Sequence, residues 1–288
     1  MTKNISVPFI FKLFKATPFL LLYGISNVIY FILRFIFPYR KKIIEKNIRN
    51  SFPNKSDQEI KNLRNKYYRH LADILVESLK MWGLSDQELL ERMKVKNPEV
   101  LEKLYLEKKS LIGIGAHYCN WEWGSLILPL ITKHHCFGVY KPLSNKKLDT
   151  FMKALRTQKG MQLIAMKDII REIIRKKSEP TFTILIADQS PMKDEIQHWE
   201  TFLNQSTAVY LGPEKISRST GYPLYYIHID KIKRGYYEIE FLLISDNPKE
   251  ENDLELTSKH VKILEKQILD HPENWLWSHN RWKHSPRN

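Results

Sequence analysis

The first part of the chain is dominated by one long apolar run. No charged side chain occurs from Ala16 to Leu33, and apolar residues continue as far as Tyr39. A helix of about 20 apolar residues is long enough to cross a lipid bilayer. The run lacks the small-residue cleavage site of a secretory signal peptide. We therefore expect residues 1–39 to be a hydrophobic anchor that spans or lies in a membrane, with a buried core helix as the alternative.

The pattern then becomes amphipathic. Residues 40–50 and 56–82 carry apolar side chains at every third or fourth position, which predicts two helices. Ser56 and Glu59 match a capping box at the start of the second helix. Because no linker rich in Pro, Gly or Ser interrupts residues 40–288, we expect them to form one domain.

From Ser110 onwards, short apolar runs alternate with helix-like stretches. The runs cover residues 111–116, 136–140, 161–166 and 181–187, and the helix-like stretches cover residues 121–132, 145–158 and 167–177. Two β-rich runs then meet at Arg234 and Gly235, which predicts an antiparallel hairpin, and a last helix is expected near 252–269. Strands that alternate with helices indicate an α/β fold with a mixed, largely parallel central sheet flanked by helices.

The net charge of the chain favours anionic binding partners but does not distinguish among them. Lys and Arg outnumber Asp and Glu by 46 to 32, giving a formal net charge of +14. This charge favours an anionic membrane, an acidic carrier protein or nucleic acid. Arg40, Lys41 and Lys42 follow the apolar run directly, and the positive-inside tendency therefore predicts a cytoplasmic main domain. Cys119 and Cys136 are too few for a disulfide framework, which agrees with a reducing compartment.

The segment LIGIGAHYCNWEWGS contains two candidate catalytic side chains directly after an apolar strand. His117 follows the strand, and a helix is expected to begin at Asn120, a good N-cap residue. Glu122 then lies in the first helical turn, and a loop could bring it to His117. A neutral imidazole whose other nitrogen donates to a carboxylate can take a proton from a hydroxyl group. We therefore predict a catalytic pair of His117 and Glu122, although a surface or core histidine remains the alternative.

Other chemistries fit the sequence less well. A zinc site is not expected, because HExxH is absent and His117 with one carboxylate gives too few ligands. The sequence also contains no GxSxG motif, which would indicate a nucleophilic serine.

Two further charged residues are candidates for the site. Asp188 follows an apolar strand, at the position where open α/β sheets place their sites; the alternative is that Asp188 caps a helix or turn. Arg156 suits bidentate phosphate binding, with a solvated helix face as the alternative. The large aromatic residues near the C-terminus are expected in the core.

Several blocks together resemble the lipid A biosynthesis acyltransferases, late-acting members of the lysophospholipid acyltransferase group. The resemblance runs from about Asn47 to the C-terminus. Its blocks are NIRNSFP (47–53), GAHYCNWEWG (115–124), YKPLSNKKLD (140–149), R-x3-G (156–160), ADQSP (187–191), ETFLNQSTAVYLGPEKISRSTGYP (200–223) and HPENWLWSHNRWK (271–283).

The resemblance implies a glycerolipid-acyltransferase-like domain on the cytoplasmic face of the inner membrane. It implies transfer of a fatty acyl chain from an acyl thioester, expected to be acyl-acyl carrier protein, to a hydroxyl of a lipid A precursor or related glycolipid. His117 would be the general base and Glu122 its partner. Substrates would contact residues within the blocks, namely Asn120, Lys141, Arg156, Asp188 and Gln189. No cofactor is implied beyond the donor, for which coenzyme A thioesters are the alternative.

Rival functions differ in what they predict. A lysophospholipid or aminolipid O-acyltransferase would yield an acylated phospholipid or aminolipid. A non-catalytic basic protein would bind membranes or nucleic acid with a steep salt dependence. No helix-turn-helix, RNP or zinc-finger pattern occurs in the sequence, so nucleic acid is not an expected partner.

Overall fold

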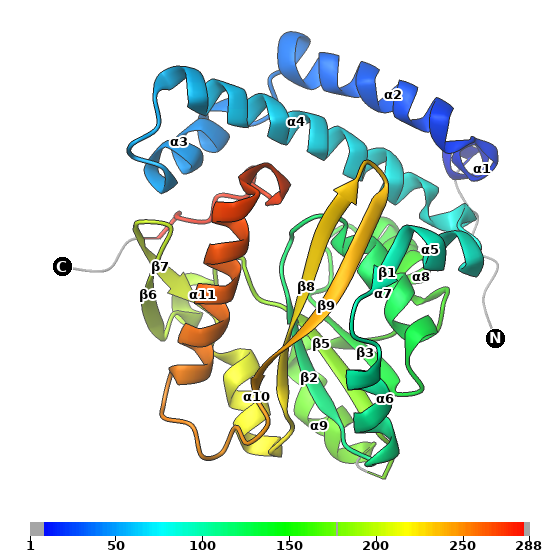
Figure 1. Ribbon diagram of the computed structural model, residues 1–288, viewed down its shortest axis with the longest axis vertical. Coiled ribbons are helices and arrows are strands. Elements are labelled where there is room, and N and C mark those ends of the chain that lie inside the picture. The colour runs from blue at the N-terminus through cyan, green and yellow to red at the C-terminus, as the bar shows by residue number, and fades with distance from the viewer. Residues whose placement is uncertain (1–8, 177, 285–288) are drawn as a thin grey trace.

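The computed structural model describes residues 9–176 and 178–284, and its centre is a seven-stranded sheet of order β1-β9-β8-β2-β5-β3-β4 (Figure 1). Every neighbouring pair in this sheet is parallel except β8 with β9, which form an antiparallel hairpin. The predicted mixed, largely parallel sheet is therefore confirmed. In chain order the strands are β1 (Met93–Val95), β2 (Leu111–Gly115), β3 (His135–Tyr140), β4 (Gln162–Ala165), β5 (Thr181–Ile186), β8 (Leu224–Lys233) and β9 (Tyr236–Ser245).

Helices surround this sheet, and a second sheet of two strands lies beside α11 (Figure 1). The small sheet pairs β6 (His198–Phe202) with β7 (Gln205–Val209) in antiparallel orientation. The helices are α1 (Phe9–Ala16), α2 (Phe19–Phe31), α3 (Lys41–Ser51), α4 (Asp57–Lys80), α5 (Asp86–Arg92), α6 (Glu99–Leu106), α7 (Trp121–Ile131), α8 (Lys146–Thr157), α9 (Ile169–Arg175), α10 (Gly212–Thr220) and α11 (Glu255–Asp270). The expected capping box at the start of α4 is present, with Ser56 and Glu59 bonded reciprocally.

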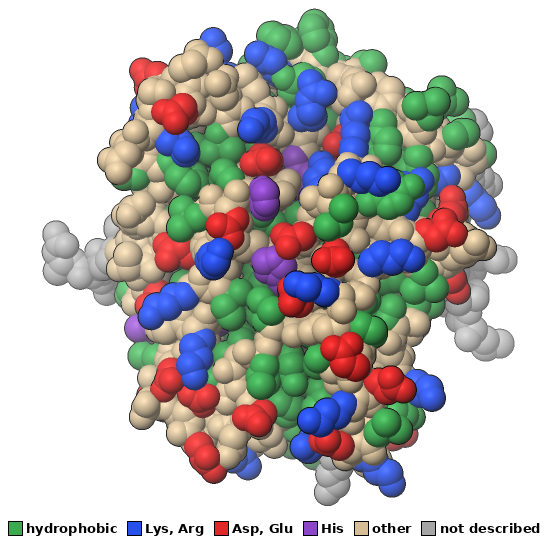
Figure 2. Space-filling view, viewed as in Figure 1, with side chains coloured by type: hydrophobic (Ala, Val, Ile, Leu, Met, Phe, Trp, Pro, Cys, Tyr) green, Lys and Arg blue, Asp and Glu red, His purple; other side chains and the backbone are tan. Residues whose placement is uncertain are grey.

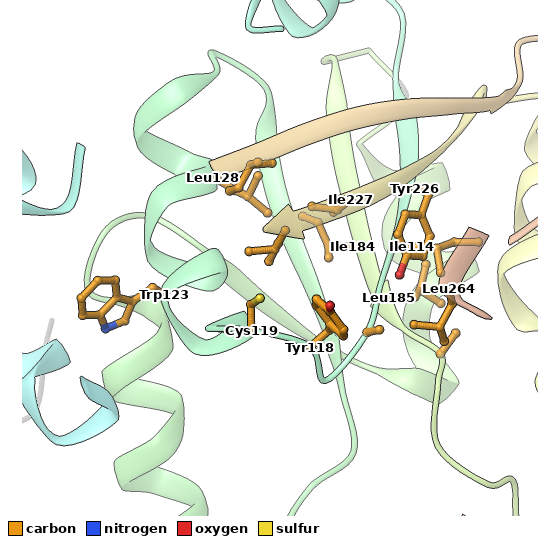
Figure 3. Close-up of a cluster of buried hydrophobic side chains, with 14 of the residues drawn as sticks. Ile114, Tyr118, Cys119, Trp123, Leu128, Ile184, Leu185, Tyr226, Ile227 and Leu264 are labelled. Atoms are coloured by element: carbon orange, nitrogen blue, oxygen red, sulfur yellow. The ribbon is translucent and has the colours of Figure 1, made fainter. Parts of the chain in front are cut away.

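The core forms where the central strands meet the helices that follow them. Figure 3 shows Ile184 of β5 and Ile227 of β8 beside Leu128 of α7, and Ile114 of β2 beside Leu264 of α11. These strands are buried along most of their length because helices cover the parallel sheet. Gly113 of β2 has no room for a larger side chain, since an added Cβ would lie 2.6 Å from the ring of Phe182.

Helix α4 lies across the end of the sheet that the β8–β9 turn approaches (Figure 1). Its residue Glu77 is fully buried and joins several elements there. The carboxylate accepts hydrogen bonds from the side chain of Asn120 at 2.6 Å, the hydroxyl of Tyr237 at 2.7 Å and the hydroxyl of Tyr23 at 2.8 Å. A buried carboxyl group is tolerated only with such partners. Glu77 therefore fixes α2, α7 and β9 to α4.

The apolar N-terminal segment packs along the outer side of α4. Helix α2 continues into a short π-helical turn, Ile32–Ile36, and Phe19–Ile36 forms an 18-residue segment with a mean hydropathy of 1.9. Its length and composition would allow it to cross a membrane. Only 11% of the segment is buried within the protein, so it is not the buried core helix considered as an alternative. Residues 1–8 of the expected anchor lie outside the described residues.

A polar seam holds α2 to the rest of the protein. Besides Tyr23, the hydroxyl of Ser26 donates to Asp73 of α4 at 2.6 Å. Arg234, in the β8–β9 turn, donates to Asp73 at 2.6 and 2.9 Å and to the side-chain oxygen of Asn27 at 3.0 Å. Asp73 and Ser26 are almost completely buried. We name this set of contacts, from Tyr23 to Asn27 on α2, the α2–α4 seam.

We expect Glu77 to make the free energy of unfolding depend on pH. Burial raises the pKa of Glu77 from 4.5 to about 7, against the lowering effect of the hydrogen bonds from Tyr237 and Tyr23. The folded protein therefore holds this proton more tightly than the unfolded chain does. The stabilisation is fully present below about pH 4.5 and is lost as the pH rises through about 7, by at most about 3 kcal/mol.

Chemical unfolding of Glu77→Gln from pH 4 to pH 8 checks this prediction. The stability of the variant relative to the wild type should increase as the pH rises between these limits, because the variant lacks the titrating group. Glu91→Gln is the control, since Glu91 is exposed on α5. A relative stability of Glu77→Gln that is constant across this range would contradict the assignment.

Candidate active site

His117 and Asp188 meet because two neighbouring parallel strands end side by side. Gly115 of β2 is in register with Ile186 of β5, and the amide of Ala187 donates to the carbonyl of Gly115 at 3.2 Å. His117 and Asp188 each follow this last register pair by two residues. Carboxyl ends of parallel strands open onto the same edge of a sheet, where α/β proteins place their sites. The prediction that both residues lie at strand ends is confirmed.

The Asp188 carboxylate braces the imidazole of His117. Nδ1 of His117 lies 2.7 Å from Oδ1 of Asp188. Trp275 donates its indole N–H to the other oxygen of Asp188 at 2.9 Å. The Asp188 side chain is 2% exposed, whereas that of His117 is 22% exposed. The pair therefore presents the ring to solvent and keeps the carboxylate inside.

Electrostatics keep Asp188 ionised despite its burial. Burial alone would raise the pKa of Asp188, but the charge of His117 and the hydrogen bonds from His117 and Trp275 lower it below its ordinary value. An ionised Asp188 accepts a hydrogen bond from the Nδ1–H of His117, so Nε2 of the neutral ring carries the lone pair. Gln189 lies at that second nitrogen, with its amide nitrogen 3.3 Å from Nε2. Trp121 packs edge-on against the ring, with the centroids 5.2 Å apart.

Glu122 does not brace His117, which corrects the predicted pair. Both carboxylate oxygens of Glu122 accept hydrogen bonds from Arg156, from Nε at 2.9 Å and from Nη2 at 2.6 Å. Glu122 lies in the first turn of α7 and Arg156 in the last turn of α8, so the bidentate pair joins the two helices. The loop that the HxxxxE spacing required is present, with Cys119 at a positive φ of 49°. It leads the chain into α7 and directs Glu122 toward α8.

Two residues expected to bind substrate are engaged within the protein. Asn120 is fully buried, and its side-chain oxygen caps α7 by accepting from the amide of Trp123 while its nitrogen donates to Glu77. The planar fork of Arg156 is occupied by Glu122, so it does not present the free bidentate face expected for a phosphate. In the structure the polar groups of both residues hold α7 in position, and substrate contact by either residue stays a prediction.

The remaining expected residues lie at the same edge of the sheet. Lys141 follows β3 and is exposed, with its ammonium 3.0 Å from the sulfur of Met192. Gln189 is half-buried beside the His117 ring. Among residues 9–176 and 178–284, no group of three or more His, Cys, Asp and Glu side chains is arranged to hold a metal ion.

The C-terminal segment completes the site, and its role could not be anticipated from the sequence. Trp275 and Tyr118 form an antiparallel bridge. Within it, the amide of Cys119 donates to the carbonyl of Asn274 at 2.9 Å, and the amide of Leu276 donates to the carbonyl of His117 at 3.1 Å. Trp275 and Trp277 are buried, as expected for core aromatics. The residues that mark this segment, HPENWLWSHNRWK, gave no sign that one indole reaches Asp188.

Arg281, near the C-terminus, is buried and only 4% exposed. Burial lowers its pKa to about 10, against the raising effect of Asp188. Asp188 and Arg281 therefore lie within electrostatic reach of each other. Burial is the main cause that lowers the pKa of His279 to about 4; the charge of Asp188 raises this pKa and that of Arg281 lowers it.

The sequence matches one family of known proteins over most of its length. The family model for bacterial lipid A biosynthesis acyltransferases matches residues 6–284. The chain is 22% identical over 251 residues to the lipid A biosynthesis palmitoleoyltransferase of Escherichia coli (strain K12), and 24% identical over 251 residues to the lauroyltransferase of that strain. A lipid A biosynthesis acyltransferase of Shigella flexneri is 22% identical over 251 residues. Each alignment covers 86% of this chain and 80% of the relative.

The ion pair of Glu122 and Arg156 should stabilise the packing of α7 on α8. Glu122→Gln leaves a guanidinium with only 30% side-chain exposure without its counter-charge, and we expect a loss of about 1–3 kcal/mol in the free energy of unfolding. A double-mutant cycle with Arg156→Met, measured by urea unfolding, should show a coupling of about 0.5–3 kcal/mol.

The exposed pair of Arg49 and Asp57 provides the matched control, and its coupling should be at most about 1 kcal/mol. Equal couplings for the two pairs would show that the Glu122–Arg156 contact contributes no more than a surface ion pair.

Proposed function

The chain belongs to the bacterial lipid A biosynthesis acyltransferase family and is an acyltransferase, and from this premise we propose that it transfers a fatty acyl chain to a hydroxyl of a lipid A precursor. The observation that carries the proposal is the partly exposed His117 ring braced by the buried carboxylate of Asp188. Such a pair suits activation of a hydroxyl and requires no covalent enzyme intermediate.

In the proposed reaction His117 is the general base. The acceptor hydroxyl replaces Gln189 at Nε2, and its proton passes to that nitrogen as its oxygen attacks the thioester carbonyl carbon. Asp188 stabilises the imidazolium that forms. The tetrahedral intermediate then collapses, the carbon–sulfur bond breaks, and the departing sulfur takes the proton from His117. Glu122 contributes indirectly in this proposal, because its ion pair with Arg156 holds α7 against α8.

The donor in this proposal is acyl-acyl carrier protein. The net charge of +14 favours an acidic carrier, because complementary charge raises the rate of encounter. Lys141, exposed beside the site, is the cation we propose to meet an anionic group of donor or acceptor. An acyl-coenzyme A donor and a lysophospholipid or aminolipid acceptor are outcomes that the experiment below can distinguish.

We further propose that α2 lies in the membrane surface and does not cross the bilayer. Its outer face exposes large apolar side chains, including Leu20 at 85% and Phe37 just beyond it at 72%. Figure 2 shows hydrophobic side chains gathered at the edge that α2 forms, above Lys and Arg side chains over α4. A spanning α2 would break the α2–α4 seam and leave Asp73 and Glu77 without these partners. A helix that lies parallel to the membrane surface keeps the α2–α4 seam and buries its apolar face in lipid.

We also propose that the α/β domain lies on the cytoplasmic face of the inner membrane, because basic residues follow the apolar segment.

Replacement of His117, the proposed general base, tests the proposed acyl transfer. His117→Ala should reduce acyl transfer by roughly 10²- to 10⁴-fold without releasing the protein from membranes. Asp188→Asn should also impair transfer, because it removes the charge beside Nδ1. His135→Ala is the control, since His135 is an exposed histidine that pairs with Glu179 at the surface.

The measurement is mass spectrometry of the lipids formed from purified enzyme with each donor and each acceptor. An added acyl mass on the lipid A precursor, with acyl-acyl carrier protein preferred over acyl-coenzyme A, is the expected result. Acylated lysophospholipid alone would change the acceptor, and full turnover by His117→Ala would refute the proposed base.

The membrane proposal predicts a specific loss of binding. Leu20→Ser, Leu21→Ser and Val28→Ser, combined in one variant, should reduce partition onto anionic vesicles by at least about tenfold, because three exposed apolar side chains are removed. Leu243→Ser with Leu269→Ser is the control, since these exposed leucines lie on β9 and α11. Equal losses in both variants would contradict binding through α2.

Depth measurements separate a flat from a spanning helix. Fluorophores attached to Leu21→Cys and to Phe35→Cys should lie at the same shallow depth when quenched by lipids labelled at known positions. A spanning helix would separate the two probes by about 21 Å along the bilayer normal. Cys119 and Cys136 are buried, which favours selective labelling of the introduced cysteines.

A further inference from the structure

The buried carboxylate of Asp188 has donors on both of its oxygens. His117 occupies Oδ1 at 2.7 Å and Trp275 occupies Oδ2 at 2.9 Å. A charged carboxylate with 2% side-chain exposure needs every such donor, because water cannot replace one that is lost. The two contacts also fix the plane of the carboxylate, and this plane determines where the imidazole of His117 points.

Trp275 is itself held rigidly. It is 2% exposed and stands between Phe202 and Trp277, with ring centroids at 5.8 and 4.8 Å in edge-on arrangements. Its backbone pairs with Tyr118, next to His117 in the chain. The same short segment therefore fixes the main chain of the catalytic loop and donates to the carboxylate behind the imidazole.

The C-terminal segment is in turn anchored on the helices that precede the sheet. The side-chain nitrogen of Asn47 in α3 donates to the carbonyls of Trp277 and His279, both at 2.9 Å. The amide of Ser278 donates to the hydroxyl of Tyr67 in α4 at 3.2 Å. These contacts leave the indole of Trp275 little freedom to move away from Asp188.

We propose that Trp275 is a positioning residue for acyl transfer: its indole N–H holds the Asp188 carboxylate in the orientation and ionisation state that brace His117. The proposal rests on the role of His117 as base. Without the indole N–H, Oδ2 has one donor fewer, and the carboxylate becomes more basic. It then binds the proton at Nδ1 more tightly and favours the protonated pair, so the acid limb of the pH–rate profile moves to higher pH.

Trp275→Phe tests this, because it keeps a buried aromatic ring and removes the N–H. We expect kcat/KM to fall roughly tenfold at neutral pH, the fold-change that corresponds to losing one hydrogen bond to a charged group. We also expect the acid limb to move upward by about half a pH unit or more. A loss of packing alone would lower the amount of folded enzyme and leave the position of the limb unchanged.

Trp277→Phe is the matched control. Trp277 is fully buried in the same segment, and its indole N–H donates to the carbonyl of Pro272 instead of to the active site. It should lower thermal stability to a similar degree without moving the acid limb. Benzothienylalanine in place of Trp275 is the second variant, since its sulfur replaces the N–H in a ring of nearly the same shape. The benzothienylalanine variant should show the same upward displacement of the acid limb of the pH–rate profile as Trp275→Phe, with a smaller loss of thermal stability.

A readout independent of turnover separates this proposal from the proposed function. NMR of ¹⁵N-histidine-labelled protein, with the His117 signal assigned from His117→Ala, follows the ring titration directly. A titration midpoint displaced in Trp275→Phe and in the benzothienylalanine variant, but not in Trp277→Phe, supports the positioning role even if His117→Ala remains active. Unchanged midpoints in both variants at position 275 would overturn it, even if His117 proves to be the base.

Discussion

A negative charge buried at the edge of a parallel sheet is the constraint on which the candidate active site depends. Asp188 lies at the end of β5 with almost no access to water, so it must be paired and hydrogen-bonded from within the protein. The imidazole of His117, at the end of the adjacent strand, provides one partner, and the indole of Trp275 provides the other. The geometry of the site thus follows from satisfying the Asp188 carboxylate with groups from two distant parts of the sequence.

Helix α4 connects this site to the apolar surface of α2. Along its buried face, Asp73 and Glu77 accept hydrogen bonds from α2, and Glu77 also accepts one from Asn120 at the start of α7. Because α7 begins directly after the loop that carries His117, the position of α2 and the position of this loop depend on one set of buried polar contacts. A lipid surface that binds α2 would therefore meet the protein on elements joined rigidly to the site.

The spacing between His117 and Glu122 suggested a hydrogen-bonded catalytic pair, but in the structure Glu122 joins α7 to α8. A carboxylate in the first turn of a helix is favourably placed for the helix dipole, and here it also accepts a bidentate pair from Arg156. This contact fixes α7 against α8, and Asn120 fixes the same helix end against α4. Glu122 and Arg156 thus position the helix that follows the His117 loop, while the hydrogen-bond partners of the imidazole are Asp188 and Gln189.

The sequence by itself determined the secondary structure around the site and the kind of chemistry. Periodicity predicted the amphipathic helices, the alternation of strands and helices predicted a largely parallel sheet, and the strand ends identified His117 and Asp188 as candidates. The family blocks identified an acyltransferase. These features are local or are carried by short motifs, so a linear pattern records them.

Only the tertiary structure decided which residues are partners. The register of β2 with β5 brings Asp188 to His117 across more than 70 positions, whereas Glu122, five residues away, points toward α8. The bridge between Tyr118 and Trp275 and the burial of Glu77 depend in the same way on segments distant in the chain. Hydrogen bonds form between groups that packing brings together, and sequence separation does not report that proximity.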